Sequence, residues 1–196
     1  MPHDVKIGVL ALQGAFREHV DAFRRLGCEA TEVRLPQDLE GVDAVVMPGG
    51  ESTTVSKLLA TSGLCEPLSD RLHAGLPAFG TCAGMILLAN VVEGAIAGQR
   101  SFGAIDIAVT RNAFGSQVHS FEHDLEIEGI EGGPFRAIFI RAPSIAHAGS
   151  GVELIARVGG QGVAARTGKV LVTAFHPELG RDLRVHEHFL GIVSEA

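Results

Sequence analysis

The sequence lacks two features that would point directly to a partner: a block of lysine and arginine residues, and a long apolar run. Its formal charge of −7 is spread along 196 residues, which argues against nucleic acid or an anionic membrane as the main partner. No apolar stretch approaches the roughly 20 residues of a membrane-spanning helix. The start of the chain, with Asp4 and Lys6 leading into a strand-like stretch, has neither the basic beginning nor the cleavage site of a signal peptide. We therefore expect a cytoplasmic protein.

Cysteine is also scarce. Cys28, Cys65 and Cys82 are an odd number without close spacing, so the sequence indicates neither a disulfide framework nor a cysteine-based zinc site. Histidine is more abundant, with nine residues. His186 and His188, however, lie two residues apart on a predicted helix, where they do not face each other as metal ligands would. We expect no metal site.

Nothing in the chain marks a boundary between domains. There is no internal repeat, no low-complexity tract and no long linker, and 196 residues are enough for one α/β domain but few for two. Hydrophobic residues make up 46% of the chain, which is typical of a packed globular fold. The sequence predicts a single domain over residues 1–196.

In the first half of the chain, short β-rich runs alternate with amphipathic helical patterns. Phe16, Val20, Phe23 and Leu26 recur at helical spacing, and Gly27 follows as a stop signal. Such alternation is typical of a mostly parallel sheet with helices on both faces. The predicted strands are residues 5–10, 28–33, 43–47 and 76–79. Helices are predicted over residues 16–26, 64–74 and 82–90, of which the second is expected to be weakened near Pro67. A further short helix is predicted to be capped by Ser52 or Thr53.

The second half of the chain is richer in strands. Alternating or continuous apolar residues predict strands at 105–109, 125–127 and 137–141. Residues 152–158, 163–166 and 170–175, separated by short turns, predict an antiparallel meander, and a last helix is predicted over 183–193. The predicted fold is a three-layer α/β sandwich around a mixed, mainly parallel sheet with an antiparallel extension.

The sharpest local motif is Gly80-Thr81-Cys82-Ala83-Gly84, between a predicted buried strand and a predicted helix. A G-x-C-x-G sequence at this place is the cysteine form of a nucleophile elbow, whose sharp turn leaves room only for glycine two residues before and two residues after the nucleophile. The start of a helix favours a thiolate at Cys82, and the N–H of Ala83 can help to hold an oxyanion. The other two cysteines have no such context and fit small buried hydrophobic side chains better.

A cysteine nucleophile needs a base, and His176 stands out among the histidines because it follows an apolar strand and precedes Pro177 and Glu178. Residues two apart on an extended chain point to the same side. Glu178 can therefore accept a hydrogen bond from one ring nitrogen of His176 while the other nitrogen faces Cys82. The pattern predicts a Cys82–His176–Glu178 triad.

The elbow, the His-Pro-Glu sequence and the glycine loop at residues 48–52 together resemble the class I, triad-type glutamine amidotransferases. Further stretches make the resemblance specific to the glutaminase subunits of pyridoxal 5′-phosphate synthases. They are residues 10–15 (LALQGA), 49–54 (GGESTT), 111–115 (RNAFG), 120–122 (SFE), 139–143 (FIRAP) and 175–178 (FHPE). The resemblance covers essentially the whole chain. It departs at Ser116, where a basic residue would follow Phe-Gly.

The resemblance implies a flavodoxin-like core and an enzyme that hydrolyses L-glutamine to L-glutamate and ammonia, with Cys82, His176 and Glu178 as its catalytic residues. The ammonia would pass to a synthase subunit, the protein partner, which builds pyridoxal 5′-phosphate from a pentose phosphate and a triose phosphate. No metal or bound cofactor is implied for this chain.

Other roles follow from the resemblance as well. Backbone groups of Gly49, Gly50 and Ala83 would form the oxyanion hole, and Gln13 would organise that loop when the partner docks. The implied glutamine-binding residues are Gly50, Glu51, Ser52, Arg111, Ile140 and Arg141.

Two other functions share much of this pattern. The first is a glutaminase subunit that serves a different product, against which the LALQGA and FIRAP stretches argue. The second is a catalytically silent regulatory protein on the same fold, which would have no need of an intact Cys82, His176 and Glu178.

Overall fold

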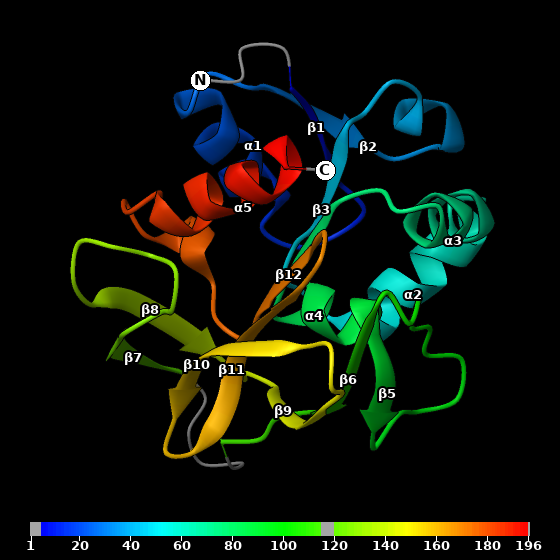
Figure 1. Cartoon of the computed structure of the whole chain (residues 1–196). Coiled ribbons are helices and arrows are strands. Elements are labelled where there is room, and N and C mark those ends of the chain that lie inside the picture. The colour runs from blue at the N-terminus through cyan, green and yellow to red at the C-terminus, as the bar shows by residue number, and fades with distance from the viewer. Residues whose placement is uncertain (1–4, 115–119, 196) are drawn as a thin grey trace.

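The computed structural model describes residues 5–114 and 120–195 of the chain (Figure 1). Ser116, the position at which the sequence departs from the resemblance, lies outside the described residues. Within the described parts, no helix is both long and apolar enough to span a membrane.

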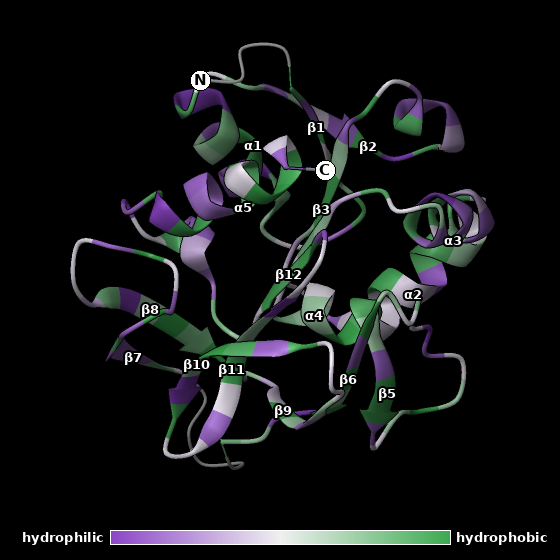
Figure 2. Ribbon diagram, viewed as in Figure 1, coloured by the Kyte–Doolittle hydropathy of each residue, from purple (hydrophilic) through white to green (hydrophobic). Residues whose placement is uncertain are grey.

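Parallel strands form the centre of the fold. They are, in their order across the sheet, β2 (Glu29–Val33), β1 (Lys6–Leu10), β3 (Ala44–Met47), β4 (Ala78–Thr81) and β12 (Val170–Thr173). Strands β3, β4 and β12 are buried at every residue, as expected for strands that are covered on both faces. They form the apolar centre of the molecule in Figure 2.

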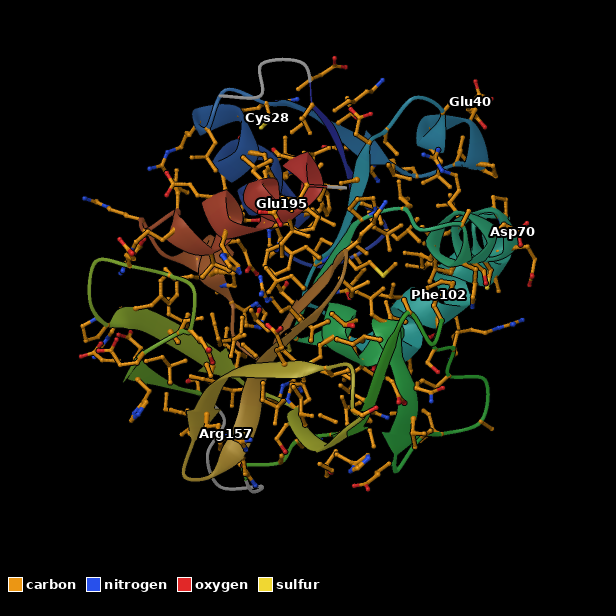
Figure 3. All side chains as sticks on the ribbon, in the orientation of Figure 1. Cys28, Glu40, Asp70, Phe102, Arg157 and Glu195 are labelled. Carbon is orange, nitrogen blue, oxygen red and sulfur yellow. The ribbon has the colours of Figure 1, made fainter. Side chains whose placement is uncertain are left out.

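Helices cover both faces of this sheet. Figure 1 shows α1 (Phe16–Arg25) and α5 (Arg184–Ser194) on one face, and α2 (Ser52–Thr61), α3 (Cys65–His73) and α4 (Ala83–Leu88) on the other. Side chains fill the space between the layers, whereas charged residues such as Glu40, Asp70 and Arg157 lie at the periphery (Figure 3). The predicted three layers are confirmed.

Beyond β12 the sheet continues with mixed strand directions. The further strands are β11 (Gln161–Thr167), β9 (Ser144–Ala148), β6 (Ile105–Thr110) and β5 (Ala89–Glu93), with β10 (Glu153–Val158) paired to β11. Strands β11 and β12 are antiparallel, as are β10 and β11. A separate antiparallel pair consists of β7 (Ser120–Leu125) and β8 (Phe135–Ile140). The antiparallel extension is therefore confirmed, although one part of it is a second sheet.

Several predicted details were wrong. The helix predicted over 82–90 ends at Leu88, because the chain continues directly as β5 and pairs with β6. Neither Ser52 nor Thr53 caps α2, because the carboxylate of Glu51 accepts the N–H groups of the first turn. Pro67 does not weaken α3, since it lies in the first turn, where a backbone N–H has no helical partner. Strand β9 was not predicted.

Two buried histidines lie between α1, α5 and the sheet. His19 and His186 are both fully buried, and the ring of His186 makes edge contacts with Phe23 and Phe79. Burial, with a contribution from Arg25, lowers the pKa of His186 to about 4. His186 is therefore neutral in the folded protein at pH 7.

This neutral histidine makes the fold sensitive to acid. The folded pKa of His186 lies below the unfolded value of about 6.5, so the unfolded state binds the additional proton between these values and stability falls as pH drops from 6.5 towards 4. His186 alone should lower the free energy of unfolding by about 2 kcal/mol between pH 7.5 and pH 5.

The measurement is urea unfolding at both pH values, with His186→Phe as the variant that cannot titrate. We expect the pH difference to shrink by about 2 kcal/mol in His186→Phe, whatever its absolute stability. An equal pH difference in both proteins would contradict the assignment of this sensitivity to His186.

Candidate active site

Cys82 joins β4 to α4 in a strained turn. Its φ is 49° and its ψ is −101°, a left-handed conformation that few non-glycine residues adopt. Gly80 and Gly84 lie so close to neighbouring backbone that no larger residue fits at either position. A Cβ atom on Gly80 would lie 2.6 Å from the backbone of Gly84, and one on Gly84 would lie 1.9 Å from the carbonyl oxygen of Met47. The predicted elbow is confirmed in its geometry.

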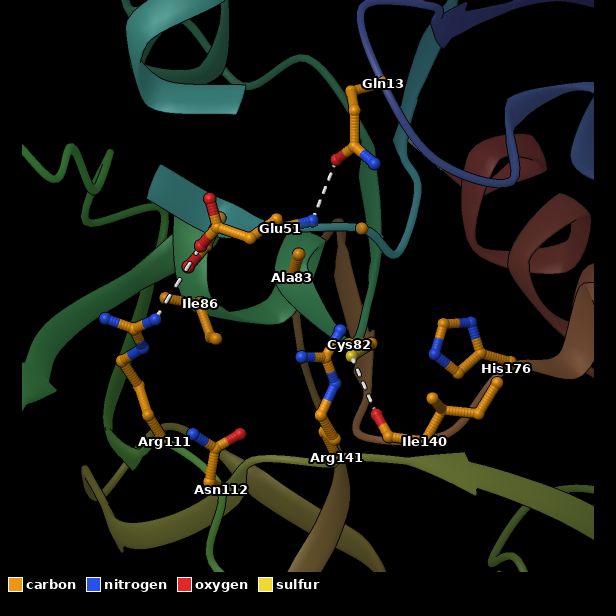
Figure 4. Close-up of a pocket in the computed structure, with 12 residues that line it drawn as sticks. Gln13, Glu51, Cys82, Ala83, Ile86, Arg111, Asn112, Ile140, Arg141 and His176 are labelled. Carbon is orange, nitrogen blue, oxygen red and sulfur yellow. Dashed lines mark hydrogen bonds and ion pairs between the residues drawn. The ribbon is translucent and has the colours of Figure 1, made fainter. Parts of the chain in front are cut away.

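The Cys82 side chain opens into a cavity of about 290 Å³ (Figure 4). Cys82, Asn112 and Arg141 are the non-glycine residues with positive φ in the described parts of the chain, and all three line this cavity. Backbone strain of this kind is concentrated at functional sites in proteins. The lining residues are Gln13, Gly50, Glu51, Ser52, Cys82, Ala83, Ile86, Arg111, Asn112, Ile140, Arg141 and His176.

The structure therefore brings together most of the predicted site residues. Glu178 lies behind His176 and does not line the cavity, and neither does Gly49. The sequence reasoning assigned no role to Ile86 and Asn112. Asn112 lay within a motif that carried the resemblance, but its side chain alone gave no signal, and Ile86 looked like any apolar helix residue.

His176 and Glu178 make the predicted contact. The distance from His176 Nδ1 to Glu178 Oε1 is 2.7 Å, and Glu178 has no exposed side-chain surface. The local structure differs from the extended chain that was predicted, because residues Pro177–Leu179 form a 3-10 turn. The turn brings the carboxylate to the Nδ1 edge of the imidazole ring.

The other ring nitrogen of His176 points towards the sulfur of Cys82 in Figure 4. Burial opposes the charged imidazolium, but hydrogen bonding to Cys82 and Glu178 outweighs it and raises the pKa of His176 to about 10. The imidazole is therefore charged at neutral pH. An imidazolium beside a cysteine stabilises the thiolate, which is the nucleophilic form.

The glycine loop is held from two sides. The Gly49 N–H donates to Thr81 Oγ1 at 2.9 Å, and the Glu51 N–H donates to Gln13 Oε1 at 2.8 Å. A Cβ atom on Gly49 would lie 2.3 Å from the His176 ring, and one on Gly50 would lie 2.4 Å from Gln13 Oε1. Because the Gly49 N–H is already donated to Thr81, it is not free to hold an oxyanion in this conformation, in contrast to the expectation.

The far side of the cavity is charged. Glu51 accepts hydrogen bonds from the backbone and hydroxyl groups of Thr53 and Thr54. Partial burial opposes the charge of Glu51, but these hydrogen bonds lower its pKa to about 2. Arg111 lies 3.8 Å from Glu51 and donates to Gln99 at 3.1 Å, and the side chain of Arg141 points into the cavity (Figure 4).

The site thus combines a cysteine thiol, an imidazole hydrogen-bonded to a buried carboxylate, and a charged wall. A thiolate attacks carbonyl carbon atoms, and an arginine-lined wall suits a substrate carboxylate. Among the described residues, no group of three or more histidine, cysteine, aspartate or glutamate side chains is placed to hold a metal ion.

Comparison with known proteins gives consistent matches over nearly the whole chain. The profile of the SNO glutamine amidotransferase family matches residues 9–195. The chain is 56% identical over 186 residues to "Pyridoxal 5'-phosphate synthase subunit PdxT" of Pelotomaculum thermopropionicum. The aligned region covers 95% of this chain and 94% of the relative.

Two further matches agree. The protein of the same name from Acidothermus cellulolyticus is 53% identical over 194 residues, covering 96% of this chain and 94% of the relative. A solved structure described as "Crystal structure of glutamine amidotransferase" superposes with a TM-score of 0.89 at 50% identity, covering 96% of this chain and 98% of the other.

The geometry predicts that Cys82 is the most reactive thiol. The three cysteines are almost equally buried, at 6%, 7% and 7% exposure, but Cys82 faces a cavity and an imidazolium, whereas burial raises the pKa of Cys28. We expect iodoacetamide at pH 7 to label Cys82 at least about tenfold faster than the other two thiols.

Peptide mass spectrometry over time measures the three rates. His176→Asn should slow the labelling of Cys82 alone, because it removes the positive charge beside the sulfur. Equal rates for the three cysteines in the unmodified chain would contradict the assignment of Cys82 as the nucleophile.

Proposed function

The chain belongs to the SNO glutamine amidotransferase family, and on that premise we propose that it is the glutaminase subunit of a pyridoxal 5′-phosphate synthase. It hydrolyses L-glutamine to L-glutamate and ammonia, and a synthase subunit uses the ammonia to build pyridoxal 5′-phosphate. We further propose that residues 1–196 form one glutaminase domain. The observation that carries the proposal is the strained Cys82 at a cavity, with His176 beside it and Glu178 bonded 2.7 Å behind.

The reaction starts when His176 takes up the proton of the Cys82 thiol. The sulfur attacks the side-chain amide carbon of glutamine, and the carbonyl electron pair moves to oxygen. The tetrahedral intermediate collapses when the C–N bond breaks and His176 returns the proton to the leaving nitrogen, which departs as ammonia. Water, deprotonated by His176, then attacks the γ-glutamyl thioester, and the C–S bond breaks to give glutamate and to restore the thiolate.

Backbone N–H groups stabilise the oxyanion of both tetrahedral intermediates. Ala83 is the first residue of α4, so its N–H has no partner within the helix and lies beside Cys82 at the cavity wall. Gly50 also lines the cavity and is the second candidate. Gly49 takes a supporting role, because its N–H fixes the loop to Thr81.

The charged wall recognises the amino-acid end of glutamine. The guanidinium groups of Arg111 and Arg141 suit the α-carboxylate, and the ionised carboxylate of Glu51 suits the α-ammonium group. Ser52 and the backbone at Ile140 complete this part of the wall. A substrate that lacks either charged group leaves part of the wall unpaired.

Partner docking controls the loop through Gln13. In the free chain its side-chain oxygen accepts the Glu51 N–H and crowds Gly50. A glycine peptide reorients at small steric cost, so a shift of Gln13 under the docked synthase subunit frees the Gly50–Glu51 segment to face the oxyanion. Hydrolysis then proceeds only when an acceptor for ammonia is present.

We expect low ammonia release by the isolated chain and a large rise when the synthase subunit is added. Gln13→Ala removes the hydrogen bond that restrains the loop, so the isolated variant should release more ammonia and the factor by which the partner raises this release should fall about five- to tenfold. Cys82→Ala should lower activity by at least about 1,000-fold in the complex.

The exposed Gln37, on the short 3-10 helix Pro36–Leu39, offers a matched control as Gln37→Ala, which should change nothing. Full activity of the isolated chain, unaffected by partner or by Gln13→Ala, would overturn the switch. Undiminished ammonia release by Cys82→Ala would overturn the proposed function itself.

A further inference from the structure

A buried imidazole lies directly behind the triad. His19, on α1, has no exposed surface, and its Nε2 atom lies 3.4 Å from Glu178 Oε2 and 3.2 Å from Thr81 Oγ1. Its Nδ1 atom lies 3.1 Å from Nε2 of His186, on α5. His19 does not line the cavity, so it has no contact with a substrate there.

The Glu178 carboxylate needs a second donor. Oε1 accepts from His176, but Oε2 is buried and makes no hydrogen bond with any described residue. A buried carboxylate with one partner is costly, because it has lost water without full compensation. The polar group that the structure places beside Oε2 is His19 Nε2.

We propose that His19 is a positioning residue of the triad, whose Nε2–H supports the outer oxygen of Glu178 and so aims that carboxylate at His176. The proposal rests on the proposed glutaminase function for its kinetic consequences. It assigns a role to a residue that the sequence did not single out.

The protonation of the two histidines supports this direction of the hydrogen bond. Burial, together with the nearby His186 and His176, holds the pKa of His19 well below its usual value, so its ring carries one proton. If that proton is on Nε2, the N–H faces Thr81 Oγ1 at 3.2 Å and Glu178 Oε2 at 3.4 Å, and Nδ1 accepts from His186, whose own Nδ1 keeps an unmatched lone pair.

The opposite arrangement is worse at both ends. A lone pair on His19 Nε2 could accept from the Thr81 hydroxyl but would also face the carboxylate of Glu178, and an N–H on His186 Nδ1 would be buried without an acceptor. An unmatched buried N–H and a repulsive contact with an anion both cost free energy. His186 therefore selects the tautomer of His19 that donates to Glu178.

The same imidazole also reaches the glycine loop. Thr81 Oγ1 lies 3.2 Å from His19 Nε2 and accepts the Gly49 N–H at 2.9 Å. His19 thus contacts both the carboxylate of Glu178 and the Thr81 hydroxyl that anchors the glycine loop. The charged wall that recognises the substrate is formed by other residues, so a loss at His19 should lower kcat and leave KM nearly unchanged.

A pair of substitutions separates this role from packing alone. The amide nitrogen of glutamine reaches about as far as Nε2 of histidine, whereas that of asparagine reaches only the Nδ1 position. In the complex with the synthase subunit, His19→Asn should lower kcat for glutamine by roughly 10- to 100-fold, with KM changed by less than about twofold. His19→Gln should recover most of the loss. The exposed His147, replaced in His147→Asn, is the control and should behave as the unmodified chain.

The pH profile provides the second readout. The titratable and charged groups around His19 and Glu178 are His176 and Cys82 on the cavity side, His186 from α5, and Arg25 beside His186. Without the Nε2–H, Glu178 is held less firmly against His176 and stabilises its imidazolium less, so the acid limb of kcat/KM should move to higher pH in His19→Asn and not in His19→Gln. Equal losses in both variants with an unmoved acid limb would show a packing role and overturn the proposal.

Two measurements do not depend on glutamine hydrolysis. Long-range 1H–15N spectra of the unmodified chain should show His19 as the neutral Nε2–H tautomer, and a neutral Nδ1–H tautomer would overturn the proposal even if the variants fail to fold. The pH dependence of Cys82 alkylation should shift upward in His19→Asn alone. If these results hold while the complex releases no ammonia from glutamine, the proposed function fails and the positioning role stands.

Discussion

The structure depends on one close approach of backbone to backbone, that of Gly84 to the carbonyl of Met47. It holds the start of α4 against the end of β3, with the Met47 oxygen where a Cβ atom would be. Because the helix begins so close to the sheet, the residue that joins it to β4 is forced into the left-handed region. That residue is Cys82, so the strain that makes it accessible arises from packing of the core.

Parallel strand direction then gathers the remaining parts of the site. Strands β1, β3, β4 and β12 run the same way, so the segments that follow them leave the sheet at one edge. Gln13, Gly50, Cys82 and His176 follow these four strands in turn. Residues that are far apart in the chain meet at the cavity because of this shared direction, and β8 adds Ile140 from a separate sheet.

Electrostatics divides the site into two halves with different requirements. Near the sulfur, a buried carboxylate keeps an imidazole charged, and the pKa of His176 rises to about 10 in spite of burial. Behind them, His19 and His186 stay neutral because burial opposes their charging. Because His19 and His186 are neutral, no second buried cation lies beside His176. Such a cation would lower the pKa of His176.

The sequence by itself determined that Cys82 lies in a strained turn and that Glu178 contacts His176, because glycine spacing and the His-Pro-Glu order are local chemical constraints. It also determined the alternation of strands and helices that makes a mixed, mainly parallel sheet. Only the tertiary structure decided where the helix after Cys82 ends, that the Gly49 N–H donates to Thr81, and that His19 and His186 meet beside Glu178. Those outcomes depend on contacts between residues up to 167 positions apart, and no local pattern encodes which buried side chains will face each other across a sheet.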